Sequence, residues 1–307
     1  MMLGSFFFKN KARRILQGKW QTALLVTFFA GIVMTLAQVA QTVSLREVQS
    51  VMNSLSAALN SMPEGITTQS TQYHEVMQLY RRLFESILSI PQSTLIGLIL
   101  LNLLALLVSP MLIVGCNQYF IRLLDGKEMP VHKALVCRFG IWHRVLWLYL
   151  IIFVKIFLWS LLFLIPGIIA AIRYSMAPYY LAEHPEMTAR EALSKSKESM
   201  KNMKMTYFML SISFVGWNLL ITVAQMFLVE FGPIVSLVAA QFMSLAVNVY
   251  MNASFAVFYA AVSREDGVEG LVRDARSSLR QMGMEDVRFP HEDDKVEINE
   301  DDGGDEE

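Results

Sequence analysis

The sequence predicts an all-α protein, a polytopic bundle of about six transmembrane helices. Of its 307 residues, 54% are hydrophobic and only 17% are charged. The apolar residues form blocks that approach or exceed the ~20 residues needed to cross a ~30 Å hydrocarbon layer. Lys and Arg gather in the connections between alternate blocks, as the positive-inside rule predicts for cytoplasmic loops. These observations exclude the soluble fold classes.

Residues 1–20 are predicted to be a cytoplasmic amphipathic segment, with five bases between residues 9 and 19. Residues 21–42 form the first predicted span. This apolar block is longer than the about 7–15 residues of a signal-peptide core, and no clear small-residue cleavage motif follows it. We therefore expect the first span to be retained.

Residues 43–91 are predicted to form an extracytoplasmic helical hairpin, because apolar residues recur there at spacings of three and four, as in coiled coils. The first seam is Leu45, Val48, Met52, Leu55, Leu59 and Met62, and the second is Val76, Tyr80, Leu83, Ile87 and Ile90. The stretches MPEG and TTQSTQ interrupt the seams, which indicates a loop at the tip. The two seams either pack on each other or bind a partner.

Residues 92–262 are predicted to form a transmembrane bundle with basic cytoplasmic connections. Its first span, 93–114, contains Ser109-Pro110, where we expect a kink. The last two spans, 207–229 and 233–262, are separated by a turn of three residues.

The apolar block from residue 145 to residue 184 is predicted to cross the membrane twice. The connections 116–144 and 184–206 hold five bases each, and a single crossing would place them on opposite sides. We therefore predict a span at 145–165, a turn at Pro166-Gly167 and a span at 168–184. A re-entrant hairpin satisfies the same argument.

This topology places both termini in the cytoplasm, with 21 bases inside, three outside and two within the spans. Residues 263–307 form the predicted cytoplasmic tail. From residue 291 the tail holds ten of the 27 acids and one base, so this end is expected to be disordered, as a solvated tail or as a docking segment.

Two cations lie within the predicted hairpin, Lys155 near the membrane midplane and Arg173 below the turn. Apart from Glu183, at the end of the span 168–184, no Asp or Glu occurs in a predicted span, and unpaired charges at membrane depth are candidates for function. Together with Tyr174 and Tyr179, they form our candidate site for an anion, such as a lipid phosphate, a carboxylate solute or an envelope precursor. In the alternative interpretation, the cations snorkel to the headgroups and the tyrosines belong to the interfacial belt. Pro178 is expected to break the helix.

The stretch TAREALSKSKESMKNMK, residues 188–204, predicts an amphipathic basic helix that starts with a capping box of Thr188 and Glu191. We expect it to lie on an anionic membrane surface or to dock onto a cytosolic partner. Its basic residues are Lys195, Lys197, Lys201 and Lys204.

The chemistry of known catalytic and metal sites is missing from the sequence. The chain has two cysteines and five dispersed histidines, without metal-ligand spacing, and no P-loop, nucleophile elbow or paired carboxylates within the spans. We expect no enzymatic activity, no cofactor, no metal and no nucleic-acid partner.

The chain carries four motifs in succession: LWSLL (158–162), IPGII (165–169), YSMAPY (174–179) and LAEHPE (181–186). These motifs resemble those of one large bacterial family of multi-pass membrane proteins, the domain of unknown function family 975. Further matches are Lys11-Ala12-Arg13, Gly18-Lys19-Trp20, EAL (191–193), Ser196-Lys197, Met200-Lys201 and FVGW (214–217), so the resemblance covers roughly 8–262. The chain departs from the family at His184 and Asn202, where Asn and Gly are common. The resemblance implies a helical fold in a bacterial plasma membrane and assigns no substrate.

We therefore expect a non-enzymatic protein that binds anionic lipid or a membrane-protein partner in envelope assembly or maintenance. The alternative hypothesis is a transporter or permease for an anionic solute or lipid, with the broken hairpin lining the path.

Overall fold

The structure is a computed structural model, which describes residues 5–61, 71–264 and 273. The chain divides into two units, Met1–Tyr259 and Ala260–Glu307, and the description below concerns the first. The described part is entirely helical and contains no strand, which confirms the predicted fold class. Five helical stretches are long and apolar enough to cross a membrane: Trp20–Ser44, Gln92–Leu124, Val131–Leu162, Lys204–Phe231 and Ile234–Ser263.

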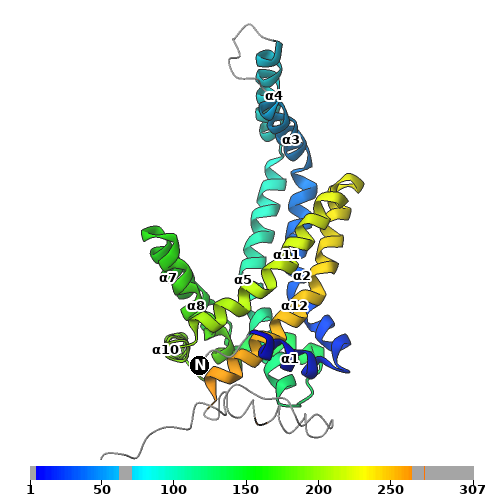
Figure 1. The fold of residues 1–307 in the computed structure, drawn as a ribbon. Helices are drawn as coiled ribbons and strands as arrows, with labels where there is room; N and C mark the ends of the chain where they lie inside the picture. The colour runs from blue at the N-terminus through cyan, green and yellow to red at the C-terminus, as the bar shows by residue number, and fades with distance from the viewer. Residues whose placement is uncertain (1–4, 62–70, 265–272, 274–307) are drawn as a thin grey trace, which may run out of the picture. The chain divides into compact units, whose positions relative to one another are not determined.

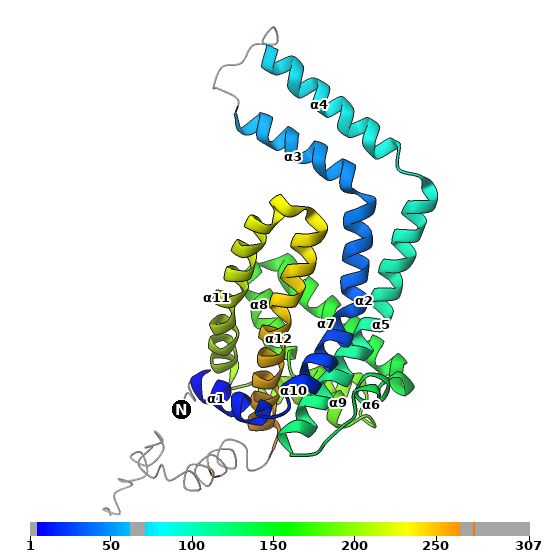
Figure 2. The same cartoon turned by 90° about the vertical axis from the view of Figure 1, so that its right-hand side faces the viewer.

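The first helix, α1 (Ser5–Leu16), packs one face on α11 (Lys204–Leu228). Phe8, Ala12 and Leu16 recur every four residues and are fully buried, as expected for one stripe of an amphipathic helix. Gly18 adopts a φ of 74°, in the left-handed region that favours glycine, and turns the chain into α2 (Trp20–Ser44). The helical hairpin expected beyond this span is also present: α3 (Arg46–Asn60) packs along α4 (Thr71–Leu88) (Figure 2).

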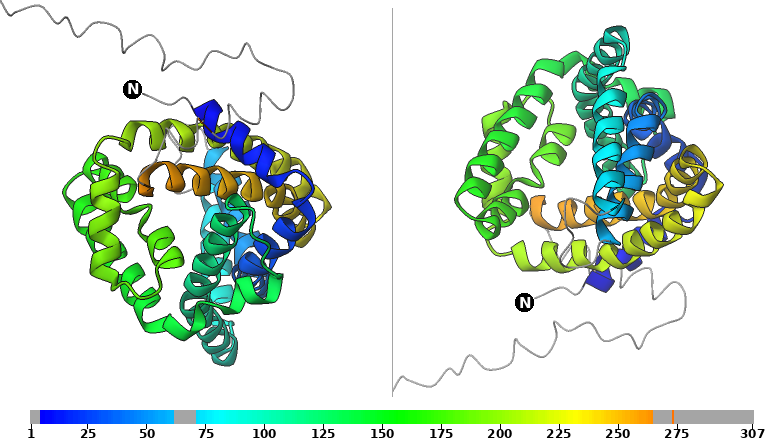
Figure 3. Two further views of the ribbon diagram at one scale, coloured as in Figure 1. Left: turned by 90° about the horizontal axis from the view of Figure 1, so that it is seen from below. Right: turned by 90° about the horizontal axis from the view of Figure 1, so that it is seen from above.

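The long helix α5 (Gln92–Leu124) is the centre of the packed region. It lies between α2 on one side and α7 (Trp142–Leu162) and α9 (Ala177–Glu183) on the other (Figure 3). The helix continues through Pro110, and nearly every residue from Ser109 to Ile121 is buried. The short helix α6 (Val131–Val136) packs against this buried half. A turn of 3-10 helix, η1 (Phe139–Ile141), leads into α7.

The expected reversal in the apolar block at 145–184 begins at Phe163, where the extended backbone (φ −158°, ψ 151°) separates α7 from α8 (Leu164–Tyr174). The two helices pack side by side (Figure 1). The stretch predicted as one span at 168–184 is divided between α8, of 11 residues, and α9, of seven. Neither alone reaches the ~20 residues of a transmembrane helix, which is why five long helices are found where about six were predicted.

The chain then forms α10 (Ala189–Ser199), α11 and α12 (Pro233–Ser263), with the 3-10 turn η2 (Val229–Phe231) between the last two. Gly232 adopts a φ of 111°, and Pro233 begins the next helix. Large apolar side chains remain exposed on the long helices, for example Phe227 of α11 at 73% and Phe153 of α7 at 67%. Such surfaces are expected to face lipid.

The tip of the outer hairpin, residues 62–70, and the acidic end from residue 291 lie outside the described residues. The predictions of a loop and of disorder there remain predictions.

Candidate functional site

The hairpin α7–α8 carries the predicted anion site. Its helices approach closely at Gly167, since a Cβ at this position would overlap Ser160 Oγ and lie 3.0 Å from Ser160 Cα and Cβ. Pro166 is the third residue of α8, where its missing N–H would have no intrahelical partner. The Pro-Gly pair therefore starts α8 and lets it pack on α7.

Lys155 and Tyr174 meet across this hairpin. The Lys155 ammonium lies 5.1 Å from the centroid of the Tyr174 ring. The ring is 7% exposed, so it is fixed by packing, and the Lys155 side chain is half-buried. A cation over an aromatic face is stabilised by about 0.5–2 kcal/mol, which offsets only part of the about 2.5–3.5 kcal/mol cost of a lysine at the centre of a membrane helix.

Arg173 directly precedes Tyr174, the residue whose ring contacts Lys155. Its guanidinium is half-buried and makes no hydrogen bond or ion pair within the described residues, while its backbone carbonyl accepts a hydrogen bond of 2.9 Å from Ser196 Oγ of α10. The structure therefore brings Lys155 and Tyr174 into contact, and Arg173 adjoins Tyr174 in the chain.

Tyr179 belongs to a different cluster. Its ring stacks on Tyr259 of α12, with centroids 5.4 Å apart, and Tyr180 meets the same ring edge-on at 5.0 Å. Tyr259 Oη also donates a 2.6 Å hydrogen bond to Glu183 Oε2. Pro178 is the second residue of α9, so it helps to start this short helix. Tyr179 thus serves packing between α9 and α12.

Two arginines of the preceding basic connection bind the carbonyls at the end of α9. Arg138 is 6% exposed and donates to the Ala182 carbonyl. Arg144 Nη1 donates to the carbonyls of Pro185 (2.7 Å) and Glu186 (3.1 Å). Carbonyls at a helix C-terminus lack intrahelical partners, and cations are favourable there. These bonds also bring the start of α7 and the end of α9 to the same side of the bundle.

The capping box of α10 is present. Thr188 N–H donates to Glu191 Oε2 (2.8 Å), and Glu191 N–H donates to Thr188 Oγ1 (3.3 Å). The hydrogen bond from Thr188 lowers the pKa of the exposed Glu191 carboxyl.

The apolar face of α10 packs against α7, α8 and α9, so protein rather than lipid covers it. The isolated amphipathic pattern could not distinguish these two environments. Lys195, Lys197 and Lys201 are exposed, and Lys204 is half-buried.

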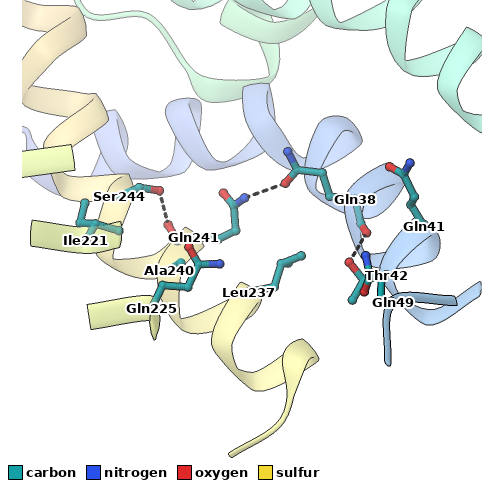
Figure 4. Close-up of a pocket in the computed structure, with 10 residues that line it drawn as sticks. All are labelled: Gln38, Gln41, Thr42, Gln49, Ile221, Gln225, Leu237, Ala240, Gln241 and Ser244. Carbon is teal, nitrogen blue, oxygen red and sulfur yellow. Dashed lines mark hydrogen bonds between the residues drawn. The ribbon is translucent and has the colours of Figure 1, made fainter. Parts of the chain in front are cut away.

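A polar pocket that the sequence analysis missed lies between α2, α3, α11 and α12, with a volume of about 450 Å³. Figure 4 shows its glutamine side chains, with Gln38 and Gln241 pointing toward one another. Gln241 Nε2 donates to Gln38 Oε1 at 3.0 Å. The sequence feature that could have indicated this pocket is the presence of isolated glutamines inside apolar blocks. No group of residues that could hold a metal ion occurs in the described part of the chain.

Comparison with known proteins gives one match. Residues 161–266 match the family model described as protein of unknown function, DUF975. This segment is similar to the DUF975 family. The matched DUF975 segment covers about a third of the chain and runs from the end of α7 through α12. No curated protein and no solved structure matches the chain.

Within the DUF975 segment, the LAEHPE motif has a structural role in this fold. Its backbone carbonyls accept the hydrogen bonds of Arg138 and Arg144, and its Glu183 accepts that of Tyr259. Both arginines precede the matched segment, as do the motifs at residues 11–20, whose resemblance to DUF975 remains a prediction.

Proposed function

We propose that this protein is a non-enzymatic membrane protein that binds an anionic lipid headgroup at the hairpin α7–α8. The observation that carries the proposal is the presence of two cations, Lys155 and Arg173, in this hairpin. Lys155 contacts the ring of Tyr174, the residue after Arg173. In the five described stretches that could cross the membrane the one acid is Glu230, in the turn at the end of Lys204–Phe231. A lipid phosphate would supply the missing negative charge and accept hydrogen bonds from both side chains.

Tyr174 would position the ammonium for this role. Its buried ring holds Lys155 beside α8, so less side-chain entropy is lost when an anion binds. The exposed lysines of α10 would attract anionic lipid toward the same end of the hairpin, by about 1 kcal/mol for each lysine near the surface.

We propose that the protein lies in a bacterial cytoplasmic membrane with both termini in the cytoplasm, and that it serves envelope assembly or maintenance. The contacts of Arg144 with Pro185 and Glu186 support this topology, because they keep the two basic connections on one side. A partner membrane protein could use the same lysine-rich surface.

A second candidate function is transport of an anionic solute or lipid. The extended backbone at Phe163 interrupts an apolar hairpin, and broken helices at membrane depth often line transport sites. This hypothesis predicts uptake by proteoliposomes that Lys155→Met abolishes.

Native mass spectrometry of the gently purified full-length protein tests the lipid proposal. Wild type is compared with the variant Lys155→Met/Arg173→Met, each incubated with phosphatidylglycerol. Lys127→Met/Lys133→Met removes the same charge at exposed positions and serves as the control. We expect retention to fall at least tenfold in the hairpin variant only. Equal retention in all three proteins would overturn the proposal.

A further inference from the structure

We infer that the space between α2 and α12 is a binding site for one lipid with an uncharged, hydrogen-bonding headgroup. Two cavities lie there in succession. The polar pocket of about 450 Å³ shares Gln241 and Ser244 with a second cavity of about 320 Å³. The second cavity continues between the same two helices and is lined mainly by apolar side chains. A polar end that adjoins an apolar groove matches the division of a lipid into headgroup and chain.

The polar pocket is lined without a charged residue. Seven of its ten lining residues are Gln, Ser or Thr, and the other three are aliphatic. The Gln38–Gln241 bond engages two of the five glutamines through their amides. The side-chain amides of Gln41, Gln49 and Gln225 make no hydrogen bond within the described residues, so they remain available to the contents of the pocket.

The chemistry of these amides selects the headgroup. A glutamine amide offers two N–H donors and a carbonyl acceptor. A neutral group that both donates and accepts, such as a hydroxyl-rich headgroup, can satisfy several amides. No cation lines the pocket to pair with an anionic phosphate, and a phosphate has no donors for the amide carbonyl oxygens. We therefore expect this pocket and the hairpin to select different lipids.

The position of the pocket along α2 matches a membrane interface. Gln41 follows Trp20 by 21 residues, which corresponds to about 31 Å along a helix, close to the ~30 Å thickness of the hydrocarbon layer. With Trp20 at one interface, the glutamines reach the headgroup level of the opposite leaflet.

The depth of the apolar groove matches one leaflet. It runs from Val39 down to Thr27, which is 12 residues or about 18 Å along α2. One leaflet contributes about half of the ~30 Å layer. Gly31 lines the groove, and a Cβ built there meets no atom within 4 Å. The groove therefore has room for a chain beside α2.

The headgroup contact is tested by native mass spectrometry with monoglucosyl diacylglycerol as the probe. Gln41→Leu/Gln225→Leu removes two free amides, and Gln21→Leu, at an exposed position of α2 outside the pocket, is the control. We expect roughly tenfold weaker retention in the double variant alone, because two neutral hydrogen bonds are lost. Unchanged retention would overturn the inference. Diacylglycerol retained as well as the glucosyl lipid would overturn it too, since the amides would then select nothing.

The groove is tested by Gly31→Phe, which fills it, against Gly97→Phe, which adds the same ring at an open position of α5. We expect only Gly31→Phe to displace the glucosyl lipid, while phosphatidylglycerol retention stays as in wild type. Lys155→Met/Arg173→Met should give the opposite pattern, so each proposal can fail without the other. Equal loss of both lipids in Gly31→Phe would contradict a separate neutral-lipid site.

Discussion

Tyr259 of α12 donates a 2.6 Å hydrogen bond to the carboxylate of Glu183 in α9, and its ring packs against both Tyr179 and Tyr180. The contact joins two residues that are 76 positions apart in the sequence. Because α9 has only seven residues, it depends on such contacts for its position.

Tyr259→Phe is expected to lower the free energy of unfolding by about 1.5–3 kcal/mol, the usual contribution of a hydrogen bond to a charged group. Denaturation in detergent, followed by tryptophan fluorescence, measures the change. Tyr149→Phe is the matched control, because the Tyr149 hydroxyl makes no hydrogen bond within the described residues. Similar losses in both variants would show that the bond to Glu183 contributes little.

Gly167→Ala is expected to destabilise the α7–α8 hairpin by about 1–3 kcal/mol, since overpacking has a cost of this size. The added methyl group would overlap Ser160 Oγ. Gly216→Ala in α11 meets no atom within 4 Å and is expected to be neutral or stabilising. Ser160→Gly should restore part of the loss, and thermal unfolding of the four proteins decides the matter. An unchanged midpoint in Gly167→Ala would contradict the close approach.

Arg144→Met is expected to cost about 1.5–3 kcal/mol, because the carbonyls of Pro185 and Glu186 lose a charged donor. Lys133→Met removes an exposed charge from the same connection and is expected to have little effect. Limited proteolysis near residue 186 should increase only in the arginine variant. Faster cleavage in both variants would point to a general effect of loop charge.

The capping box of α10 should weaken in acid. The folded-state pKa of Glu191 lies below its ordinary value of 4.5, so the stabilisation is complete above that value and is lost as the pH falls through the folded pKa. Hydrogen exchange at the Thr188 amide, corrected for the intrinsic rate, should accelerate over this interval in wild type. Glu191→Gln should remove the pH dependence, because its amide oxygen still accepts but does not titrate. A pH-independent wild type would refute the assignment.

The sequence predicted those parts of the fold that depend on local pattern. Apolar length identified the long helices, spacing identified the pair α3–α4, and Thr188 with Glu191 marked the start of α10. The reversal was predicted at Pro166-Gly167, three residues after its position at Phe163. The prediction was wrong because Pro is compatible with a turn and also with the first turn of a helix. The close approach of Gly167 to Ser160 shows that the pair belongs to the helix, and a local sequence pattern does not reveal this contact between two helices.

The hairpin site was predicted from the sequence and the glutamine pocket was not, again because only local patterns can be recognised there. Lys155 and Tyr174 meet because they lie on the two helices of one hairpin. The hairpin could be predicted because the connections on both sides of it are basic. The glutamine pocket joins α2, α3, α11 and α12, and no periodicity places Gln38 beside Gln241. The bases of the connection 116–144 were interpreted only as a sign of topology, but Arg138 binds a carbonyl of α9 and Arg144 binds the carbonyls of Pro185 and Glu186 just beyond it.

The division of the fourth expected crossing into α8 and α9 has a consequence for biogenesis. A nascent helix of 11 or seven residues is too short to leave the translocon as an independent transmembrane helix. We expect it to enter the bilayer together with α7, which is synthesised before it. Tyr259 emerges from the ribosome much later, so α9 reaches its final contacts only when α12 is inserted. Truncation before α12 should therefore leave a nascent chain that membrane quality-control proteases recognise at α9.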